Sequence, residues 1–320
     1  MAVNADKIDR WKADIARSVD FYNDWFIKFA PKTYRETRLA TIHQVESALA
    51  WTANLTDISG AVLREHPEVL AMLRMSTAPP LARDRLIGLA AISPSLVRSM
   101  EIDQRIPSRM VESHLDEHLT KIGRIINQLA DIDIFPWLEP KRAPKAVEIH
   151  RAATIVADRL CGSMADPLIR NAQEKRQLAA LQVWLESRGY TLAKASDKLA
   201  FNQMHPGTIA FRLNVPVKLE GGVTQINIPI DTVAMPRKAR KGALPILIEA
   251  KSAGDFTNTN KRRKEEAAKI SQLRKNYGPN VRFVLFLCGY FDSGYLGYEA
   301  AEGIDWVWEH RIEDLAKFGL

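Results

Sequence analysis

A chain of 320 residues with a formal net charge of +7 is long enough for one large or two modest hydrophobic cores, and its basic balance favours an acidic partner. No apolar run approaches the roughly 18 residues that cross a membrane, and we expect no signal peptide. Two cysteines do not make a disulfide framework and suit a reducing compartment. We therefore expect a cytoplasmic protein without a membrane segment.

The first part of the chain has the hydrophobic pattern of helices, which are divided by prolines. We expect these helices over residues 5–29, 35–55, 60–75, 80–92, 94–102 and 107–130. Residues 135–145 contain prolines and basic residues that indicate a linker or a sharp change of direction, and a helix over 145–161 follows. The sequence therefore predicts a helical domain over 1–140 and a connecting segment over 141–165.

After residue 165 the pattern changes to mixed helices and strands. Asp166 and Pro167 are typical of a helix start, as N-cap and first helical residue, and this helix should end at Gly189. We expect strands over 208–217, 224–233, 244–251, 281–287 and near 304–308, and helices over 257–276 and 311–318. A helix between two strands favours a parallel crossover, whereas the preceding hairpin is antiparallel. The expected fold is mixed α/β, with a central mixed sheet flanked by helices over 166–320.

Two of these strands end in charged residues. The first reaches Asp231, and the second ends in Glu249-Ala250-Lys251. Side chains alternate along a strand, so Glu249 and Lys251 share a face, and pairing of the strands would bring Asp231 beside them. Two carboxylates can bind a hard cation such as Mg²⁺, and a neighbouring lysine can orient or activate a water. The pattern predicts metal-assisted phosphodiester hydrolysis, and the alternative is two amphipathic strands with solvated charged ends.

Basic and amide side chains gather in the sequence around this predicted site. One group occupies the hairpin loop, and the other follows the second strand into the next helix. The residues are Arg237, Lys238, Arg240, Lys241, Asn258, Asn260, Lys261, Arg262, Arg263 and Lys264. We expect them to contact the phosphates of double-stranded DNA, although a charge run can also be a solvated helix face.

Glu174 has an unusual position in the expected helix over 167–188. It lies on the same stripe as Leu178, Leu181 and Leu185, and a carboxylate on an apolar face usually needs a partner. That partner could be Arg170, one turn earlier, or the metal site, to which Glu174 would add a third acid. The sequence leaves both possibilities open.

One competing motif is present. His114, Glu117 and His118 match the H-x-x-E-H pattern of some zinc peptidases. The segment is highly charged, and the sequence places no convincing third ligand, so an exposed helix face is the better interpretation. The chain contains neither a P-loop nor a G-x-G-x-x-G motif, which argues against a nucleotide cofactor.

Two segments carry a resemblance to a known family. Residues 249–266 and 169–178 look like segments of type II restriction endonucleases, and the chain as a whole is similar to the XamI-type enzymes of the PD-(D/E)xK nuclease superfamily. The resemblance implies a restriction-endonuclease-like core in a bacterial protein. It also implies Mg²⁺-dependent cleavage of double-stranded DNA at a short sequence, with a companion methyltransferase that protects the host DNA.

By this resemblance, Asp231 and Glu249 would hold the metal, Lys251 would serve the attacking water, and Glu174 would be an auxiliary acid. The chain departs from the motif in having Ile230 between the proline and Asp231, which lowers the specificity of the pattern. The alternatives are a repair or structure-specific nuclease of the same fold and a DNA-binding protein without catalysis. Because a two-fold dimer matches a palindromic site, we expect a homodimer in which residues 1–140 contribute to DNA embrace or subunit contact.

Overall fold

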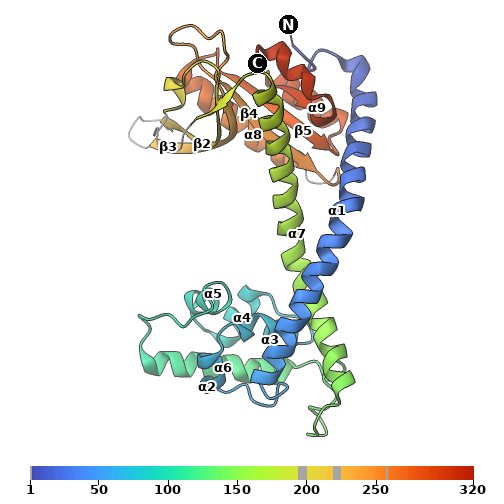
Figure 1. The fold of residues 1–320 in the computed structure, drawn as a ribbon. Coiled ribbons are helices and arrows are strands. Elements are labelled where there is room, and N and C mark those ends of the chain that lie inside the picture. The colour runs from blue at the N-terminus through green and yellow to red at the C-terminus, as the bar shows by residue number, and fades with distance from the viewer. Residues whose placement is uncertain (1, 194–199, 219–224, 257–258) are drawn as a thin grey trace. The chain divides into compact units, whose positions relative to one another are not determined.

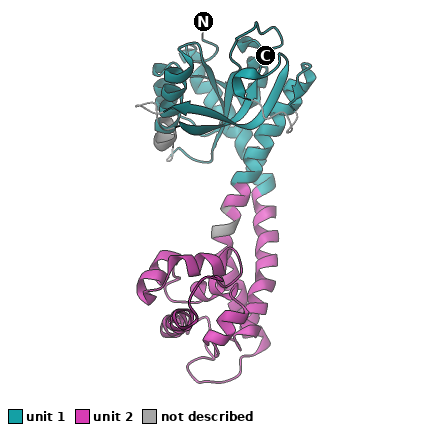
Figure 2. Ribbon diagram, turned by 90° about the vertical axis from the view of Figure 1, so that its left-hand side faces the viewer, with its two compact units in different colours: residues 1–29, 170–320 teal, residues 30–169 magenta. Residues whose placement is uncertain are grey.

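The computed structural model describes residues 2–193, 200–218, 225–256 and 259–320. Within the helices, the side chains of residues 163, 164, 166 and 259–263 are not described. The chain forms two compact units, one of residues 1–29 with 170–320 and one of residues 30–169 (Figure 2). We call them the sheet unit and the helical unit.

The helical unit contains the second half of α1 (Ile8–Trp51), five short to medium helices and the first part of α7 (Ala146–Ser187) (Figure 1). The five are α2 (Gly60–Glu65), α3 (Val69–Met75), α4 (Arg83–Ala90), α5 (Pro94–Glu101) and α6 (Glu112–Leu129). In α6, Leu115, Leu119, Ile122 and Ile126 recur at helical spacing and are buried. Full burial of each such side chain contributes about 1.5–3 kcal/mol, which holds this unit together.

Two helices are longer than the sequence predicted. Helix α1 continues through Pro31, and α7 continues through Pro167, so the predicted helix start at Asp166 and Pro167 is wrong. A proline inside a helix removes a backbone hydrogen bond and crowds the preceding turn. Here packing overrides that cost, because α7 contributes Ala157 to the core of the helical unit and Leu185 to that of the sheet unit.

The compact units therefore differ from the expected segments 1–140, 141–165 and 166–320. Residues 1–29 belong with the sheet unit, and α7 runs from one unit into the other. A sequence pattern shows where a helix is amphipathic, but it does not show which of two cores each half of the helix joins.

The sheet unit is built on a mixed sheet. Its strands are β1 (Thr191–Leu192), β2 (Thr208–Lys218), β3 (Gln225–Ala234), β4 (Ile246–Ala253), β5 (Arg282–Gly289) and β6 (Asp305–Trp308). They are ordered β1-β2-β3-β4-β5-β6, with β3 antiparallel to β2 and β4, and the other neighbours parallel. The predicted mixed α/β fold is confirmed, including the parallel pair β4 and β5 across α8 (Thr259–Tyr277).

The sequence missed several elements of this unit. These are β1, helix α9 (Ser293–Ala301) and the short 3-10 helix η2 (Phe201–Gln203). The expected last helix is the 3-10 helix η3 (Glu309–Phe318). Helix α9 contains two glycines and begins at the Asp292 N-cap, whose side chain accepts the Tyr295 N–H.

Both faces of the sheet are covered. On β4, Ile246 and Ile248 face the cluster that includes α7 and η3, whereas Leu247 faces the cluster that includes α8, α9 and Trp11 of α1. Strand β5 is buried over Phe283–Gly289, as its continuous apolar sequence predicted. Along β4, the odd-numbered residues therefore point toward the α8 side.

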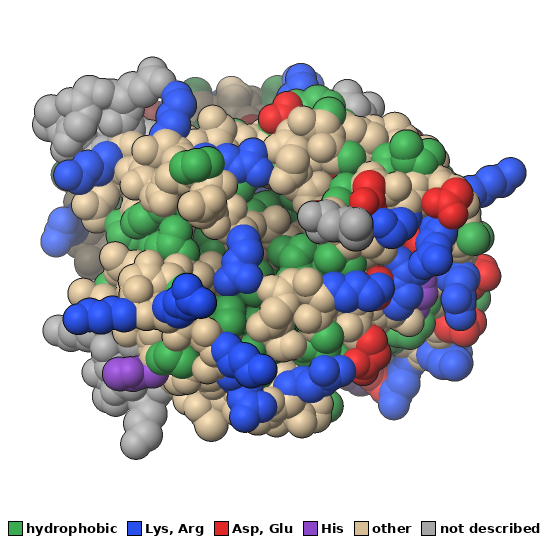
Figure 3. Space-filling view, turned by 90° about the horizontal axis from the view of Figure 1, so that it is seen from above, with side chains coloured by type: hydrophobic (Ala, Val, Ile, Leu, Met, Phe, Trp, Pro, Cys, Tyr) green, Lys and Arg blue, Asp and Glu red, His purple; other side chains and the backbone are tan. Residues whose placement is uncertain are grey.

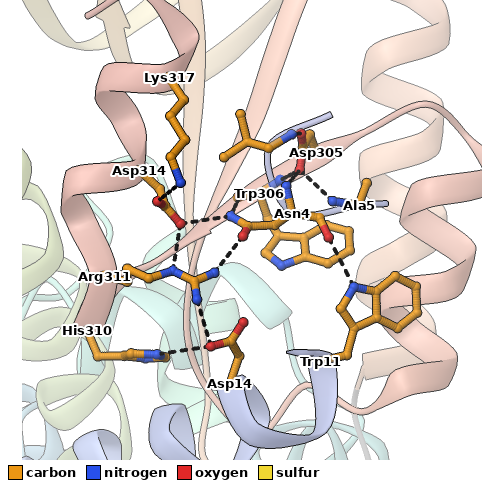
Figure 4. Close-up of polar contacts among 11 residues, drawn as sticks. Asn4, Ala5, Trp11, Asp14, Asp305, Trp306, His310, Arg311, Asp314 and Lys317 are labelled. Atoms are coloured by element: carbon orange, nitrogen blue, oxygen red, sulfur yellow. Dashed lines mark hydrogen bonds and ion pairs between the residues drawn. The ribbon is translucent and has the colours of Figure 1, made fainter. Parts of the chain in front are cut away.

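Hydrogen bonds and ion pairs hold the N-terminal segment against the C-terminal segment (Figure 4). The backbone N–H groups of Asn4 and Ala5 each donate to Asp305 at 3.0 Å. Arg311 donates to Asp14 of α1 at 2.8 Å and to Asp314 at 2.6 Å. These buried and half-buried contacts explain why the first residues pack with the sheet unit rather than with the other helices.

Two further expectations can be checked on the described part of the chain. Cys161 and Cys288 are both buried free thiols. No helix in the described ranges combines the length and the apolar composition that crossing a bilayer requires.

Candidate active site

The candidate site lies where β3 and β4 part. Their ladder runs from Ala234 paired with Ile246 to Thr232 paired with Ile248, and Asp231 and Glu249 are the next residues along. Asp231 Oδ2 accepts the backbone N–H of Ala250 at 2.8 Å. The aspartate thus binds the neighbouring strand through its side chain at the position where the backbone ladder ends.

A cleft of about 320 Å³ opens at this point. Strands β3 and β4 contribute the three charged residues that the motif predicted, Asp231, Glu249 and Lys251, and α7 contributes Glu174. The cleft is also lined by Arg170, Gln173, Gln177, Ala250, Ser252 and Glu265. The structure therefore brings all four predicted catalytic residues to one cleft.

Lys251 lies between two carboxylates. Its Nζ is 3.1 Å from Glu249 Oε1 and 3.0 Å from Oε1 of Glu266, a residue of α8. Lys269, one turn further along α8, also forms an ion pair with Glu249. Glu249 and Glu266 are both buried, at 4% and 0% exposure. The four side chains form a row of alternating charge, Lys269–Glu249–Lys251–Glu266, that joins β4 to α8.

The protonation of the cleft follows from burial and these charges. Burial, followed by the charge of Glu249, raises the pKa of Asp231 to about 6, although the Ala250 N–H and Lys251 oppose the shift. Burial disfavours the charged form of Lys251, but Glu249 and Glu266 outweigh it and raise its pKa above the ordinary value. Lys251 is therefore an ammonium ion at neutral pH and can donate hydrogen bonds, but it cannot accept a proton.

Helix α7 holds β4 in place beside the lysine. Gln177 Nε2 donates to the carbonyl of Phe286 at 3.2 Å and to that of Lys251 at 3.4 Å. Gln173 Nε2 donates to Ser252 Oγ, which in turn donates to the Cys288 carbonyl at 3.1 Å. Both glutamines are buried, so these bonds fix β4 at Lys251 and Ser252 against the neighbouring strand β5.

Glu174 has a partner that the sequence did not suggest. Its Oε1 accepts a hydrogen bond from Arg212 of β2 at 2.7 Å, and both side chains are substantially exposed. Arg212 has a left-handed backbone, with φ at 51°, between the pairs Phe211–Thr232 and Leu213–Ile230. This register places it opposite Asp231. The sequence had proposed Arg170 or a metal as partner, and Arg170 lines the same cleft.

Comparison with known proteins identifies the family. Residues 53–308 match the family described as XamI restriction endonuclease. The chain is also 55% identical, over 99% of its length and 99% of the relative's, to "Type II restriction enzyme SalI" from Streptomyces albus G.

The chain belongs to the XamI restriction endonuclease family. This confirms the resemblance drawn from the two sequence segments, and the chain is an enzyme of the restriction endonuclease class. No solved structure matches it significantly.

The XamI-family enzyme could hold a divalent cation in its cleft. Among the described residues, no three His, Cys, Asp or Glu side chains converge as a metal site. Mg²⁺, however, usually takes only one or two carboxylates and completes its shell with waters and substrate phosphates. Asp231 and Glu249 supply that number, and the buried Glu249 Oε2 has no hydrogen-bond partner within the described ranges. The donor set therefore fits a cation that is shared with a phosphodiester.

The zinc-peptidase pattern of α6 has an ordinary structural role. Glu117 forms an ion pair with Lys121 at 2.7 Å, one turn later, and His114 is exposed. His118 is half-buried on the same helix. These contacts agree with the interpretation as a charged helix face.

The structure describes only part of the predicted DNA-binding set. Asn258 lies outside the described residues, and the side chains of Asn260, Lys261, Arg262 and Arg263 on α8 are not described. The remaining members are exposed: Arg237, Lys238, Arg240, Lys241 and Lys264. None of these five is in the lining of the cleft. Figure 3 shows Lys and Arg side chains spread widely over one face of the XamI-family enzyme, whereas Asp and Glu gather toward one side of it.

Sequence reasoning missed two residues of α8 that form ion pairs with the charged residues of the cleft. Glu266 and Lys269 share the inner face of that helix with Ile270 and Leu273, at spacings of three, four and seven residues. This periodicity was available in the sequence. It was obscured because the helix over 257–276 was interpreted from the basic residues at its start, as a DNA-facing or solvated face.

Proposed function

We propose that this restriction endonuclease is a type II enzyme that hydrolyses double-stranded DNA at a specific sequence, with Mg²⁺ as cofactor. Asp231, Glu249 and Lys251 form the catalytic centre. The observation that supports this proposal is the convergence of two carboxylates and a lysine ammonium in one cleft, at the point where β3 and β4 part.

Asp231 and Glu249 would hold the cation, which when bound supplies charge neutralisation at phosphorus and a more acidic water. The Lys251 ammonium donates to the attacking water or to a non-bridging phosphate oxygen and so orients in-line attack. A new P–O bond forms from water, the bond to the 3′ oxygen breaks, and the leaving oxygen takes up a proton. The raised pKa of Lys251 suits this role as donor.

Glu174 is the auxiliary acid of the proposed mechanism. Its carboxylate borders the cleft and adds to the negative potential at Asp231, whose pKa it raises slightly. The pair with Arg212 is exposed, and exposed ion pairs contribute little stability. Glu174 would therefore release Arg212 at small cost and could offer its carboxylate as a third acid if the cleft held a cation.

DNA binding rests on the basic surface. The exposed basic residues of the hairpin loop and the polar residues around the start of α8 would contact phosphates on both sides of the cut. The second group consists of Asn258, Asn260, Lys261, Arg262, Arg263 and Lys264. In the helical unit, Arg98, Arg105 and Arg109 border a groove of about 490 Å³. They support a role for this unit in DNA embrace, with subunit contact as the other expected role.

The assembly proposed is a homodimer in the bacterial cytoplasm. One active site per chain cuts one strand, and a two-fold dimer matches a palindromic site. A companion methyltransferase would protect the same sequence in the host. Sedimentation with and without a cognate duplex checks the dimer, and a monomer on DNA that makes double-strand breaks in single encounters would contradict it.

The decisive experiment is digestion of a fully sequenced plasmid, with Mg²⁺ or with EDTA, followed by mapping of the cut ends. We expect discrete fragments that share one short sequence in Mg²⁺, and none in EDTA. Asp231→Asn, Glu249→Gln and Lys251→Ala should each abolish cleavage while DNA binding survives. Near wild-type cutting by Asp231→Asn would refute the site, and ends without a common sequence would favour a structure-specific nuclease.

A further inference from the structure

We infer that Glu266 of α8 is a positioning residue that holds the Lys251 ammonium in its working place. This inference rests on the proposed catalytic role of Lys251. Glu266 is fully buried, and its Oε1 lies 3.0 Å from Lys251 Nζ. Within the described side chains, Lys251 is its only ion-pair partner.

The placement of Glu266 in the core has a cost that needs a compensating partner. Its carboxylate lies on the inner face of α8, next along that face to Ile270 and Leu273 of the apolar core. Removing a carboxylate from water is strongly unfavourable unless a cation is close, and an apolar residue of similar size is often at least as stable there. Burial raises the pKa of Glu266, and the charge of Lys251 opposes that shift. The acid is thus a poor choice for packing alone, but a suitable anchor for a buried ammonium ion.

Glu249 alone cannot provide that anchor. It already contacts Lys269 as well as Lys251, and in the proposed mechanism it also holds the cation. A cation on Glu249 would repel Lys251 and weaken its hold on that carboxylate. Glu266 approaches Lys251 from α8, whereas Glu249 belongs to the same strand as the lysine, so Glu266 can keep the ammonium beside the phosphate when Glu249 is engaged.

The test compares Glu266→Gln, which keeps the shape and removes the charge, with Glu266→Asp, which keeps the charge but shortens the side chain by one methylene. Single-turnover cleavage of a cognate duplex is measured at saturating enzyme and Mg²⁺, and DNA affinity is measured without metal. We expect Glu266→Gln to slow cleavage by ~10- to 100-fold, on the scale of a misplaced catalytic group. DNA affinity should be unchanged, and Glu266→Asp should have an intermediate rate.

Glu302→Gln is the matched control, because it removes one negative charge at an exposed residue of α9's C-cap. It should cleave at the wild-type rate. A wild-type rate in Glu266→Gln, or no recovery in Glu266→Asp, would overturn the inference. Should Glu266→Gln fail to fold, Glu266→Met, which is uncharged and of similar size, takes its place, and a wild-type rate in that variant would overturn the inference.

The same series separates this inference from the proposed function. If Lys251→Ala cleaves at the wild-type rate, the proposed catalytic centre is wrong. If Lys251→Ala is inactive while Glu266→Gln is fully active, only the positioning role of Glu266 is refuted.

Discussion

Asp231 shows at the scale of one residue how the position proposed for a metal-binding carboxylate can oppose stability. Its carboxylate is partly buried, next to the charge of Glu249, and its pKa rises from 3.8 to about 6. The pKa of Asp231 is higher in the folded protein than in the unfolded chain. Its protonated carboxyl therefore adds to the free energy of unfolding in full below about pH 3.8, and this contribution is lost as the pH rises through about 6. At neutral pH the protein therefore carries an ionised aspartate at a site that disfavours the ion.

This difference predicts a gain in stability from removal of the charge. In EDTA at pH 8, Asp231→Asn should raise the free energy of unfolding by at most ~3 kcal/mol, the equivalent of the pKa difference. At pH 4.5 the gain should shrink, because the wild-type aspartate is then largely protonated in the folded state. Urea denaturation at the two pH values measures the effect. A variant that is less stable than the wild type at pH 8 would show that the ionised carboxylate stabilises the fold.

Helix α7 shows at the scale of one element how tertiary packing overrides a local signal. Asp166 and Pro167 have the form of a helix start, yet the helix runs continuously from Ala146 to Ser187. Its two halves bury apolar residues in different cores, as Ala157 and Leu185 show. A break at Pro167 would gain a normal N-terminus, but the continuous helix keeps its backbone hydrogen-bond ladder while each half packs in its own core.

The continuity of α7 can be tested by Pro167→Ala. In an uninterrupted helix, alanine relieves a proline that costs up to ~3 kcal/mol, so the thermal midpoint and the helical signal should both rise. If a helix instead began at Pro167, proline would be favourable there and alanine would lower or leave unchanged the stability. Pro94→Ala is the matched control, because Pro94 is the first residue of α5, and its replacement should bring no gain.

Charge acts at the scale of the whole molecule. The net charge of +7 does not show where the positive residues lie. They are concentrated in two clusters of the sequence, one in the hairpin loop and one at the start of α8. Such clusters bind DNA by releasing counterions, which makes the affinity depend on salt. The identity of the bound sequence depends instead on a few contacts to base edges.

The basic start of α8 gives a quantitative prediction. Joint neutralisation of Lys261, Arg262 and Arg263 to glutamine should flatten the plot of log affinity against log salt by about one unit for each lost phosphate contact. Titrations of a labelled duplex at several salt concentrations measure the slope. Lys121→Gln, in the ion pair with Glu117 on α6, is a control for the loss of one positive charge away from α8. An unchanged slope in the triple variant would mark the α8 cluster as a solvated face.

The sequence by itself determined the mixed sheet, the strands that carry Asp231 and Glu249, and the shared face of Glu249 and Lys251. These features depend on local periodicity, since alternation along a strand places residues two apart on the same side. The tertiary structure alone decided that Glu174 pairs with Arg212, that Glu266 approaches Lys251, and that residues 1–29 join the sheet unit. Such pairings join residues far apart in the chain, and their choice depends on how whole elements pack, which a local pattern does not contain.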